Sequence, residues 1–341
     1  MRSVATLGSH CALQLLKGAK DEGLRTVLVC ERGRLGLYGR YPFIDVTVPV
    51  DSFAEVAGRE CRRVLAENKS VLVPHGTLVA QLGESEISSI EAPVFGNRRM
   101  LRWESDRVLK EKLMREAGLR VPDPVASPAD ISGPVIAKRQ GAAGGRGYFV
   151  SSTPQEYEEK RAALVSDGTI SDGEELYLQR YVPGVLAYLQ YFYSPLHGRL
   201  EFFGADQRHE SDIEGLARIP AAQQPGSGWT PSFNVIGNSP IVLRESLLDG
   251  AYRMGESFVE ASGRLVGPGM NGPFCIEGVY GADASFTSFE FSARIVAGTS
   301  VYMGGSPYYG LLFGEEMSMG RRIAREIREA DESGRLGEVA F

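Results

Sequence analysis

The chain contains few of the residues that mark a disulfide framework, a metal cluster or a membrane span. Its 341 residues include only four histidines and four cysteines, the latter at positions 11, 30, 61 and 275. These cysteines have neither the spacing of metal ligands nor the density of a disulfide framework, which fits a reducing cytoplasm. No apolar run approaches the ~18 residues of a transmembrane helix, and the N-terminus lacks a signal-peptide pattern. We therefore expect a cytoplasmic protein that is neither secreted nor membrane-embedded.

A marked excess of one charge sign is also missing. The chain has 37 basic and 43 acidic residues and a net charge of −6, which argues against a surface that coats nucleic acid. Hydrophobic residues make up 43% and charged residues 23% of the chain, as is ordinary for a soluble enzyme. Because 341 residues are many for one core, we expect two or three lobes with a cleft between them.

The first hundred residues alternate short apolar strands with amphipathic helices. Strands are expected at residues 3–7, 26–30 and 71–73, with a helix near 12–22, which is the rhythm of a parallel sheet. Ligands bind such sheets beyond the carboxyl ends of the strands, where residues 8–10 and 74–77 fall. Ser9 is predicted to cap the first helix and offer a phosphate seat, with His10 at its rim. The alternative is a structural cap beside a partly buried histidine.

Residues 135–150 combine a strand tipped by Lys138, a glycine-rich loop and a second apolar strand. Four glycines within seven residues allow backbone N–H groups to turn toward an anion, and Lys138 and Arg146 add positive charge. No Gly-Lys-Ser/Thr follows, so the pattern is not a P-loop. It predicts a strand-loop-strand clamp for a nucleotide polyphosphate, with an ordinary flexible hairpin as the alternative.

A second hairpin is predicted from strands at 274–280 and 285–291 with a turn at 281–284. If the centre of the hairpin lies between Asp283 and Ala284, Glu277 and Glu290 face each other with Cβ atoms roughly 5 Å apart, so their charges repel unless a cation lies between them. Mg²⁺ prefers such carboxylates together with phosphate oxygens. Ser292 and Arg294 share the Glu290 face, whereas Phe289 and Phe291 are predicted to face a core. The alternative is a pair of solvent-exposed glutamates on an edge hairpin.

The segments around these hairpins give weaker signals. Residues 97–103 form a basic bridge that either links lobes or faces an anion, and Asp106 caps a helix ending at Gly118. On that helix Lys110 is expected to be solvated.

A strand at 176–182 can offer its backbone to an adenine ring, and Tyr188, Tyr191 and Tyr193 on the next strand are expected to pack rather than stack on a base. Residues 220–240 are expected to form a loop or lid, and helices are expected at 241–261 and 316–329.

These features, in this order, resemble the ATP-grasp superfamily. A narrower resemblance, to the archaeal formate-dependent AICAR ligases (FAICAR synthetases), covers essentially the whole chain. It is carried by Thr-Leu-Gly-Ser-His at 6–10, Pro-His-Gly at 74–76, Phe-Gly-Asn-Arg-Arg-Met-Leu-Arg-Trp-Glu-Ser at 95–105, Gly-Gly-Arg-Gly-Tyr-Phe at 144–149, Gly-Asn-Ser-Pro at 237–240 and Phe-Glu-Phe-Ser-Ala-Arg at 289–294.

The resemblance implies an α/β protein with α+β lobes, namely an ATP-grasp fold behind a parallel-sheet, Rossmann-like lobe. The implied lobes are 1–105 for ribotide binding, 106–195 with the phosphate clamp, and 196–341 with the metal carboxylates. The implied reaction, which belongs to purine (IMP) synthesis, uses ATP and formate to formylate AICAR through formyl phosphate, releasing ADP and phosphate. The family also suggests a homo-oligomer, either a trimer or a hexamer, with no nucleic-acid or membrane partner.

The resemblance also implies roles for individual residues. Glu277 and Glu290 would hold Mg²⁺ or Mn²⁺, and Glu290 and Arg294 would serve catalysis. Ribotide contacts are implied for Ser9, His10, Thr77 and Asn238. Nucleotide contacts are implied for Lys112, Lys138, Gly144, Gly145, Arg146, Gly147, Gln179, Tyr181, Val182 and Glu210.

Several positions depart from the family pattern. Thr77 replaces a serine, His209 replaces a tyrosine, residues 141–144 lack an arginine, and residues 295–307 lose an acid and two asparagines. Two alternatives therefore stay open: a related ATP-grasp ligase acting on another acid or ribotide, and a catalytically silent nucleotide-binding subunit.

Overall fold

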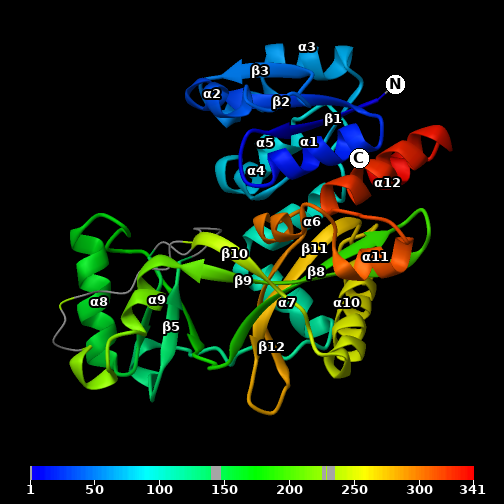
Figure 1. Cartoon of the computed structure of the whole chain (residues 1–341). Coiled ribbons are helices and arrows are strands. Elements are labelled where there is room, and N and C mark those ends of the chain that lie inside the picture. The colour runs from blue at the N-terminus through cyan, green and yellow to red at the C-terminus, as the bar shows by residue number, and fades with distance from the viewer. Residues whose placement is uncertain (1, 140–146, 225–227, 229–234) are drawn as a thin grey trace.

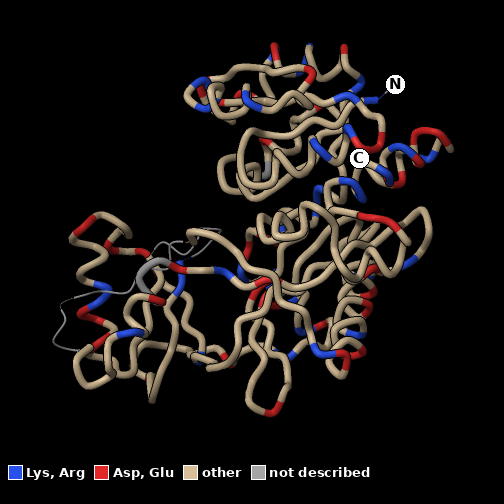
Figure 2. The backbone as a smooth tube through the Cα atoms, viewed as in Figure 1, with Lys and Arg blue, Asp and Glu red and all other residues tan. Residues whose placement is uncertain are grey.

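Three β-sheets organise the chain in this computed structural model, which describes residues 2–139, 147–224, 228 and 235–341. One sheet is parallel and two are antiparallel, so the expected mixed α/β class is confirmed (Figure 1). Positions of Lys and Arg are interspersed with positions of Asp and Glu along the backbone (Figure 2). No helix among the described residues has both the length and the apolar character needed to cross a membrane.

The N-terminal lobe holds the parallel sheet predicted from the strand-helix alternation. Its strand order is β3-β2-β1-β4, and every pairing is parallel. The strands are β1 (Ser3–Leu7), β2 (Arg25–Glu31), β3 (Val46–Val50) and β4 (Ser70–Leu72). The surrounding helices are α1 (Ala12–Asp21), η1 (Arg32–Arg34), α2 (Leu35–Tyr38), η2 (Phe53–Ala57), α3 (Arg59–Glu67), α4 (Gly76–Gln81) and α5 (Glu84–Ser88).

The smallest sheet has the order β6-β5-β7 and is antiparallel. It consists of β5 (Val135–Lys138), β6 (Phe149–Ser151) and β7 (Tyr177–Arg180), accompanied by η3 (Pro128–Asp130) and α8 (Pro154–Ser166). Val135, Ala137 and Leu178 alternate onto one face and pack with Phe149 and Tyr157. The loop predicted to clamp phosphate joins β5 to β6, and residues 140–146 of it lie outside the described residues.

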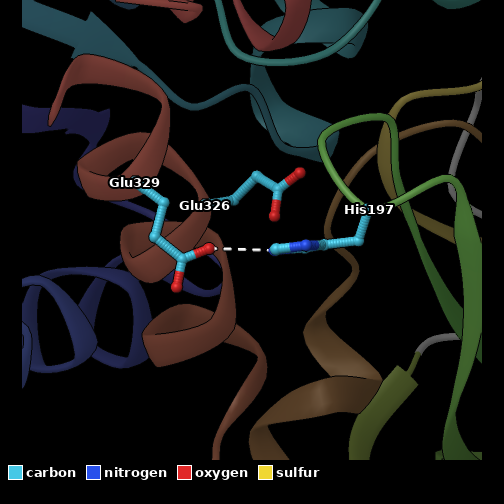
Figure 3. Close-up of side chains that lie close together, drawn as sticks. All are labelled: His197, Glu326 and Glu329. Atoms are coloured by element: carbon cyan, nitrogen blue, oxygen red, sulfur yellow. Dashed lines mark hydrogen bonds and ion pairs between the residues drawn. The ribbon is translucent and has the colours of Figure 1, made fainter. Parts of the chain in front are cut away.

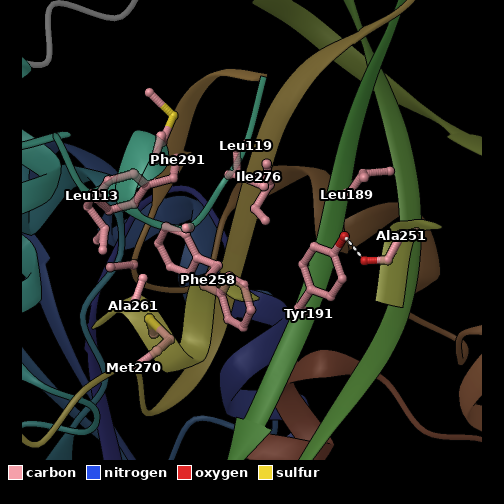
Figure 4. Packing of buried hydrophobic residues seen from close by; sticks show 14 of the residues in the cluster. Leu113, Leu119, Leu189, Tyr191, Ala251, Phe258, Ala261, Met270, Ile276 and Phe291 are labelled. Atoms are coloured by element: carbon pink, nitrogen blue, oxygen red, sulfur yellow. Dashed lines mark hydrogen bonds between the residues drawn. The ribbon is translucent and has the colours of Figure 1, made fainter. Parts of the chain in front are cut away.

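The largest sheet has the order β10-β9-β8-β11-β12 and is antiparallel throughout. Its strands are β8 (Val185–Ser194), β9 (Arg199–Glu210), β10 (Val235–Ile241), β11 (Gly272–Tyr280) and β12 (Phe286–Ser292). Helices α7 (Arg107–Glu116) and α10 (Glu245–Leu265) contribute Leu113 and Phe258 to its core (Figure 4). The lobe boundary expected at residue 195 therefore separates β8 from strands of its own sheet.

The remaining elements are α6 (Arg98–Ser105), α9 (Ser211–Leu216), η4 (Ala221–Gln223), η5 (Ala297–Tyr302), α11 (Pro307–Phe313), α12 (Met319–Glu332) and α13 (Leu336–Val339). The basic bridge at 97–103 is mostly helix α6, capped by the Asn97 side chain. The prediction that the loop extends to Pro240 is wrong at its C-terminal end, because residues 235–241 form β10, which pairs with β9. For the same reason the next helix begins at Glu245 rather than at Ile241.

Helix α12 packs directly against α1, which brings residues about 300 positions apart into one core (Figure 1). Two glycines allow this close approach. A Cβ atom added at Gly18 would lie 2.2 Å from the Arg321 nitrogen, and one added at Gly320 would lie 2.2 Å from the Gln14 carbonyl oxygen. Leu15, Ile323 and Ile327 are fully buried around the crossing. The N-terminal lobe is thus completed by the last helices of the chain.

Candidate active site

The N-terminal lobe and both antiparallel sheets contribute residues to one cavity of about 570 Å³. The N-terminal lobe supplies His10 and Gly76, and α7 supplies Lys110. The smallest sheet and the segment after it supply Lys138, Gln179, Tyr181 and Val182, and the largest sheet and its continuation supply Arg208, Glu210, Glu277, Glu290, Ser292 and Arg294. The expected cleft between lobes is therefore present.

The two predicted metal carboxylates lie opposite each other in the β11–β12 hairpin, as the sequence indicated. Nearer the turn the pairing is offset by one residue, with Tyr280 opposite Phe286, and a bulge at Phe289 brings Glu290 opposite Glu277. The bulge also turns Phe289 into the cavity, where its ring lies 5.2 Å from the Lys138 ammonium nitrogen. The prediction that Phe289 faces a core is thus wrong, while Phe291 is fully buried in that core.

Each carboxylate is paired with a basic side chain. Lys110 Nζ lies 2.5 Å from Glu290 Oε1, and Arg208 Nη2 lies 2.9 Å from Glu277 Oε2. The Glu277 side chain is 3% exposed and that of Glu290 is 23% exposed, so the alternative of two solvent-facing glutamates is wrong. Burial favours the protonated form of Glu290, but the charges of Lys110, Arg107 and Lys138 outweigh it and hold the Glu290 pKa well below its usual range.

These two carboxylates fit a divalent cation, because Mg²⁺ takes one or two hard carboxylate ligands together with phosphate oxygens. Another group with ligand-like spacing lies outside the cavity lining, where Glu326 and Glu329 of α12 approach His197 (Figure 3). Its carboxylates already have partners: Arg322 and Ser194 bond Glu326, and His197 bonds Glu329. The cavity carboxylates have partners too, but only they line a cavity in which a phosphate ligand could share the cation, so they are the better candidate metal site.

The two lysines of α7 are placed the opposite way from the prediction. Lys110, expected to be solvated, is buried and bonds Glu290, whereas Lys112 is exposed and does not line the cavity. Residues Arg107, Lys110, Leu113 and Met114 make up the buried face of the helix. Their spacing of three to four residues is the sequence signal that identifies Lys110.

Lys138 is held at the cavity wall by Gln179, whose Oε1 accepts a 3.0 Å hydrogen bond from the ammonium group. Burial lowers the Lys138 pKa to about 8, which still leaves most of the group charged at neutral pH. Gln179, Tyr181, Val182 and Glu210 line the cavity. Gly144, Gly145 and Arg146 lie outside the described residues, and Gly147 has a φ of +75°.

At the N-terminal end of the cavity, His10 stacks on buried His75 with ring centroids 5.4 Å apart. His75 Nε2 bonds the Leu7 carbonyl, and its Nδ1 accepts from the Thr77 backbone N–H, as expected of a neutral ring. Thr77 Oγ1 lies 2.8 Å from His10 Nδ1. We assign the hydroxyl as donor, which leaves a proton on His10 Nε2. Burial and then the Arg294 charge lower the His10 pKa.

Arg294 is oriented by Glu104 of α6, a residue that the sequence motifs did not single out as functional. Glu104 Oε1 forms a 2.9 Å ion pair with Arg294 Nη2, and Glu104 Oε2 accepts a 2.8 Å hydrogen bond from the Ala293 N–H. A Cβ atom added at Gly76 would lie 3.3 Å from both Arg294 Nη2 and His10 Nε2. Glycine at 76 therefore keeps these two groups close together.

Three of the four expected ribotide contacts do not line the cavity. Ser9 does not line the cavity and does not cap α1, because the N-cap position is Cys11, which makes no side-chain capping bond. The Ser9 hydroxyl lies 3.0 Å from His10 Nδ1 instead. Thr77 is buried behind His10, and Asn238 donates to Asp206. Tyr188, expected only to pack, lines the cavity beneath Arg208, with the guanidinium 4.1 Å from the ring centre.

Most of the departures from the family pattern also lie away from the cavity lining. Residues 296–306 do not line it; Thr299 bonds Gln14, and Tyr302 donates to the Ala205 carbonyl. His209 pairs with Glu214 at the surface.

Comparisons with known proteins agree with this architecture. Family models described as "Protein of unknown function (DUF1246)" and "Domain of unknown function (DUF1297)" match residues 4–125 and 156–340. A protein of Cenarchaeum symbiosum named 5-formaminoimidazole-4-carboxamide-1-(beta)-D-ribofuranosyl 5'-monophosphate synthetase is 70% identical over 99% of both chains. One of the same name from Nitrosopumilus maritimus is 64% identical over 99% of both chains.

Solved structures extend the likeness to three dimensions. An IMP biosynthesis protein PurP from Thermococcus kodakaraensis has a TM-score of 0.78 at 33% identity, covering 99% of this chain and 100% of that one. An N5-carboxyaminoimidazole ribonucleotide synthetase matches with a TM-score of 0.68 at 15% identity, over 95% of this chain and 76% of that one. This likeness confirms the ATP-grasp fold. The chain belongs to the family of 5-formaminoimidazole-4-carboxamide-1-(beta)-D-ribofuranosyl 5'-monophosphate synthetases.

Proposed function

We propose that this protein formylates AICAR to FAICAR with ATP and formate, releasing ADP and phosphate in purine synthesis. The observation that carries the proposal is the convergence of three lobes on one cavity. A carboxylate pair and two lysines lie at one part of its wall, and His10 and Arg294 lie at another. Relatives at 64% and 70% identity over almost their entire length carry the corresponding name.

In the first step a formate oxygen attacks the γ-phosphorus of ATP, and the bond to ADP breaks. Lys138 and Lys110 line the cavity with ammonium groups that can bind the phosphates. The segment at Tyr181 and Val182 is the proposed adenine contact. Glu277 and Glu290 would hold Mg²⁺ or Mn²⁺, which supplies charge neutralisation during phosphoryl transfer.

In the second step the 5-amino nitrogen of AICAR attacks the carbon of formyl phosphate, the bond to phosphate breaks, and the proton that the amine loses passes to the departing phosphate. Arg294 would neutralise the phosphate that departs. His10, with its Nδ1 engaged by Thr77, would present an Nε2–H donor to the ribotide. Ser9, Thr77 and Asn238 remain proposed ribotide residues, of which Ser9 and Thr77 would act through His10.

The homo-oligomer that the resemblance suggests and the cytoplasmic location that the cysteine usage fits both form part of this proposal. A ligase acting on a different acid or ribotide is the second candidate. The departures from the family pattern at residues 295–307 motivate this candidate. Residues 296–306 do not line the cavity, which weakens it. A silent subunit is the least favoured, because two carboxylates and two lysines facing one cavity have no evident structural need.

The test is a reaction containing protein, ATP, Mg²⁺, formate and AICAR, with formate or AICAR omitted in parallel. We expect FAICAR and ADP to form in equal amounts, and FAICAR only when both substrates are present. ADP release without FAICAR would favour another acid or acceptor, and ATP binding without any product would favour the silent subunit.

A further inference from the structure

We propose that Lys110 occupies the cation position on Glu290 until nucleotide binds, and so makes metal binding depend on the phosphates of the nucleotide. This inference rests on the proposed function for the identity of the nucleotide and the cation. Its structural basis is the 2.5 Å contact between Lys110 Nζ and Glu290 Oε1.

The position of Lys110 is fixed by its helix. Asp106 caps α7 by accepting from the backbone of Val108 and Leu109, and Leu113 lies in the core of the largest sheet. Only 5% of the Lys110 side chain is exposed. A buried ammonium group needs an anion nearby, and Glu290 provides one.

The charges around the pair oppose the entry of a cation alone. Among the described residues, the charged groups that line the cavity are five basic side chains, Lys110, Lys138, Arg180, Arg208 and Arg294, and four carboxylates, Glu104, Glu210, Glu277 and Glu290. Positive groups therefore already outnumber negative ones. A divalent cation that takes Glu290 Oε1 displaces the Lys110 ammonium group from that oxygen and adds to the positive excess. A polyphosphate supplies the missing negative charge and offers the displaced ammonium group a new partner. Metal and nucleotide are therefore expected to bind cooperatively, with Lys110 as a positioning residue.

The experiment measures Mn²⁺ binding to the full chain by the loss of the free-ion paramagnetic resonance signal, with and without ADP. Lys110→Met keeps much of the apolar stem and removes the ammonium group. Lys112→Met is the matched control, because this lysine lies on the same helix but is exposed and does not line the cavity. Lys110→Gln keeps a hydrogen-bond donor and serves as a second variant if the methionine variant does not fold.

We expect Lys110→Met to bind Mn²⁺ about ten-fold more tightly than wild type without nucleotide, because one charge-assisted hydrogen bond no longer competes. The gain in affinity on adding ADP should shrink correspondingly, and Lys112→Met should match wild type. Folded Lys110 variants that bind Mn²⁺ no more tightly than Lys112→Met would overturn the proposal. Tighter binding with an undiminished ADP effect would also overturn it, since Lys110 would then only repel the cation.

A neighbouring charge provides a further check. Lys138→Met removes a positive group that bonds Gln179, and it should tighten Mn²⁺ binding less than Lys110→Met. An equal effect would contradict direct competition at Glu290. Wild-type protein that makes no FAICAR would refute the proposed function, but the Mn²⁺ comparison without nucleotide would still stand.

Discussion

Replacing Glu104 with glutamine should impair the reaction strongly, although we assign Glu104 no direct role in the chemistry. Its two oxygens accept from Arg294 Nη2 and from the Ala293 N–H at 2.9 and 2.8 Å. Glutamine has one acceptor oxygen, so one of these donors must face an NH₂ group. The change also removes the negative charge beside Arg294, whose side chain is only 14% exposed.

Losing one charge-assisted hydrogen bond in a buried setting costs about 1.5–3 kcal/mol. If that cost falls on the orientation of Arg294 in the transition state, kcat/KM falls by roughly 10- to 150-fold. The assay is steady-state ADP release at varied formate and AICAR, with thermal unfolding measured in parallel to show that the variant is folded.

We expect kcat/KM for both substrates to fall in Glu104→Gln while the KM for ATP changes little. Glu67→Gln is the control, because Glu67 forms an exposed surface pair with Arg63, and it should behave as wild type. Wild-type kcat/KM in a folded Glu104→Gln protein would refute the view that this ion pair orients Arg294 for catalysis.

Three further predictions concern other residues. Glu290→Gln should lower ADP release on the order of a thousand-fold while circular dichroism stays unchanged; wild-type ADP release would remove Glu290 from the metal site. Thr77→Val should raise the KM for AICAR about five-fold, since one neutral hydrogen bond to His10 is lost, and Thr77→Ser should not; equal effects of the two would contradict the hydroxyl's role. Burial raises the Asp206 pKa from 3.8 to about 6, so the folded protein binds more protons than the unfolded chain, and its stability should fall by about 2 kcal/mol between pH 4 and 6. Urea unfolding across that range should show this fall in wild type but not in Asp206→Asn, and parallel curves would contradict it.

The sequence predicted those parts of the site that depend on local pattern. The strand-helix rhythm is enough for the parallel sheet, and alternation with a turn signal is enough to place Glu277 and Glu290 on facing strands. Their direct pairing also depends on the bulge at Phe289, because the register nearer the turn is offset by one residue. The bulge and the direction of Phe289 could not be predicted from alternation, which assumes that every residue of the strand is paired.

Other parts of the site depend on how elements pack against one another. Lys110 and Lys112 differ by two positions on a helix, so they point in very different directions, and only the docking of α7 decides which one meets Glu290. Ser9 was predicted as a cap from residue type, but the turn continues to Cys11 before α1 begins. Glu104 lies in a helix that the sequence presented as a basic bridge.

The crossing of α1 and α12 also bears on how the chain folds as it is synthesised. The N-terminal sheet leaves the ribosome long before Ile323 and Ile327, which cover the apolar face of α1 around Leu15. Until then that face is exposed, and the lobe cannot complete its folding independently. The core of this lobe around Val27 and Leu78 contains N-terminal residues alone and can form earlier. The face of α1 around Leu15 is covered only once α12 has been made, so the domain-by-domain folding of this lobe is completed only at the end of translation.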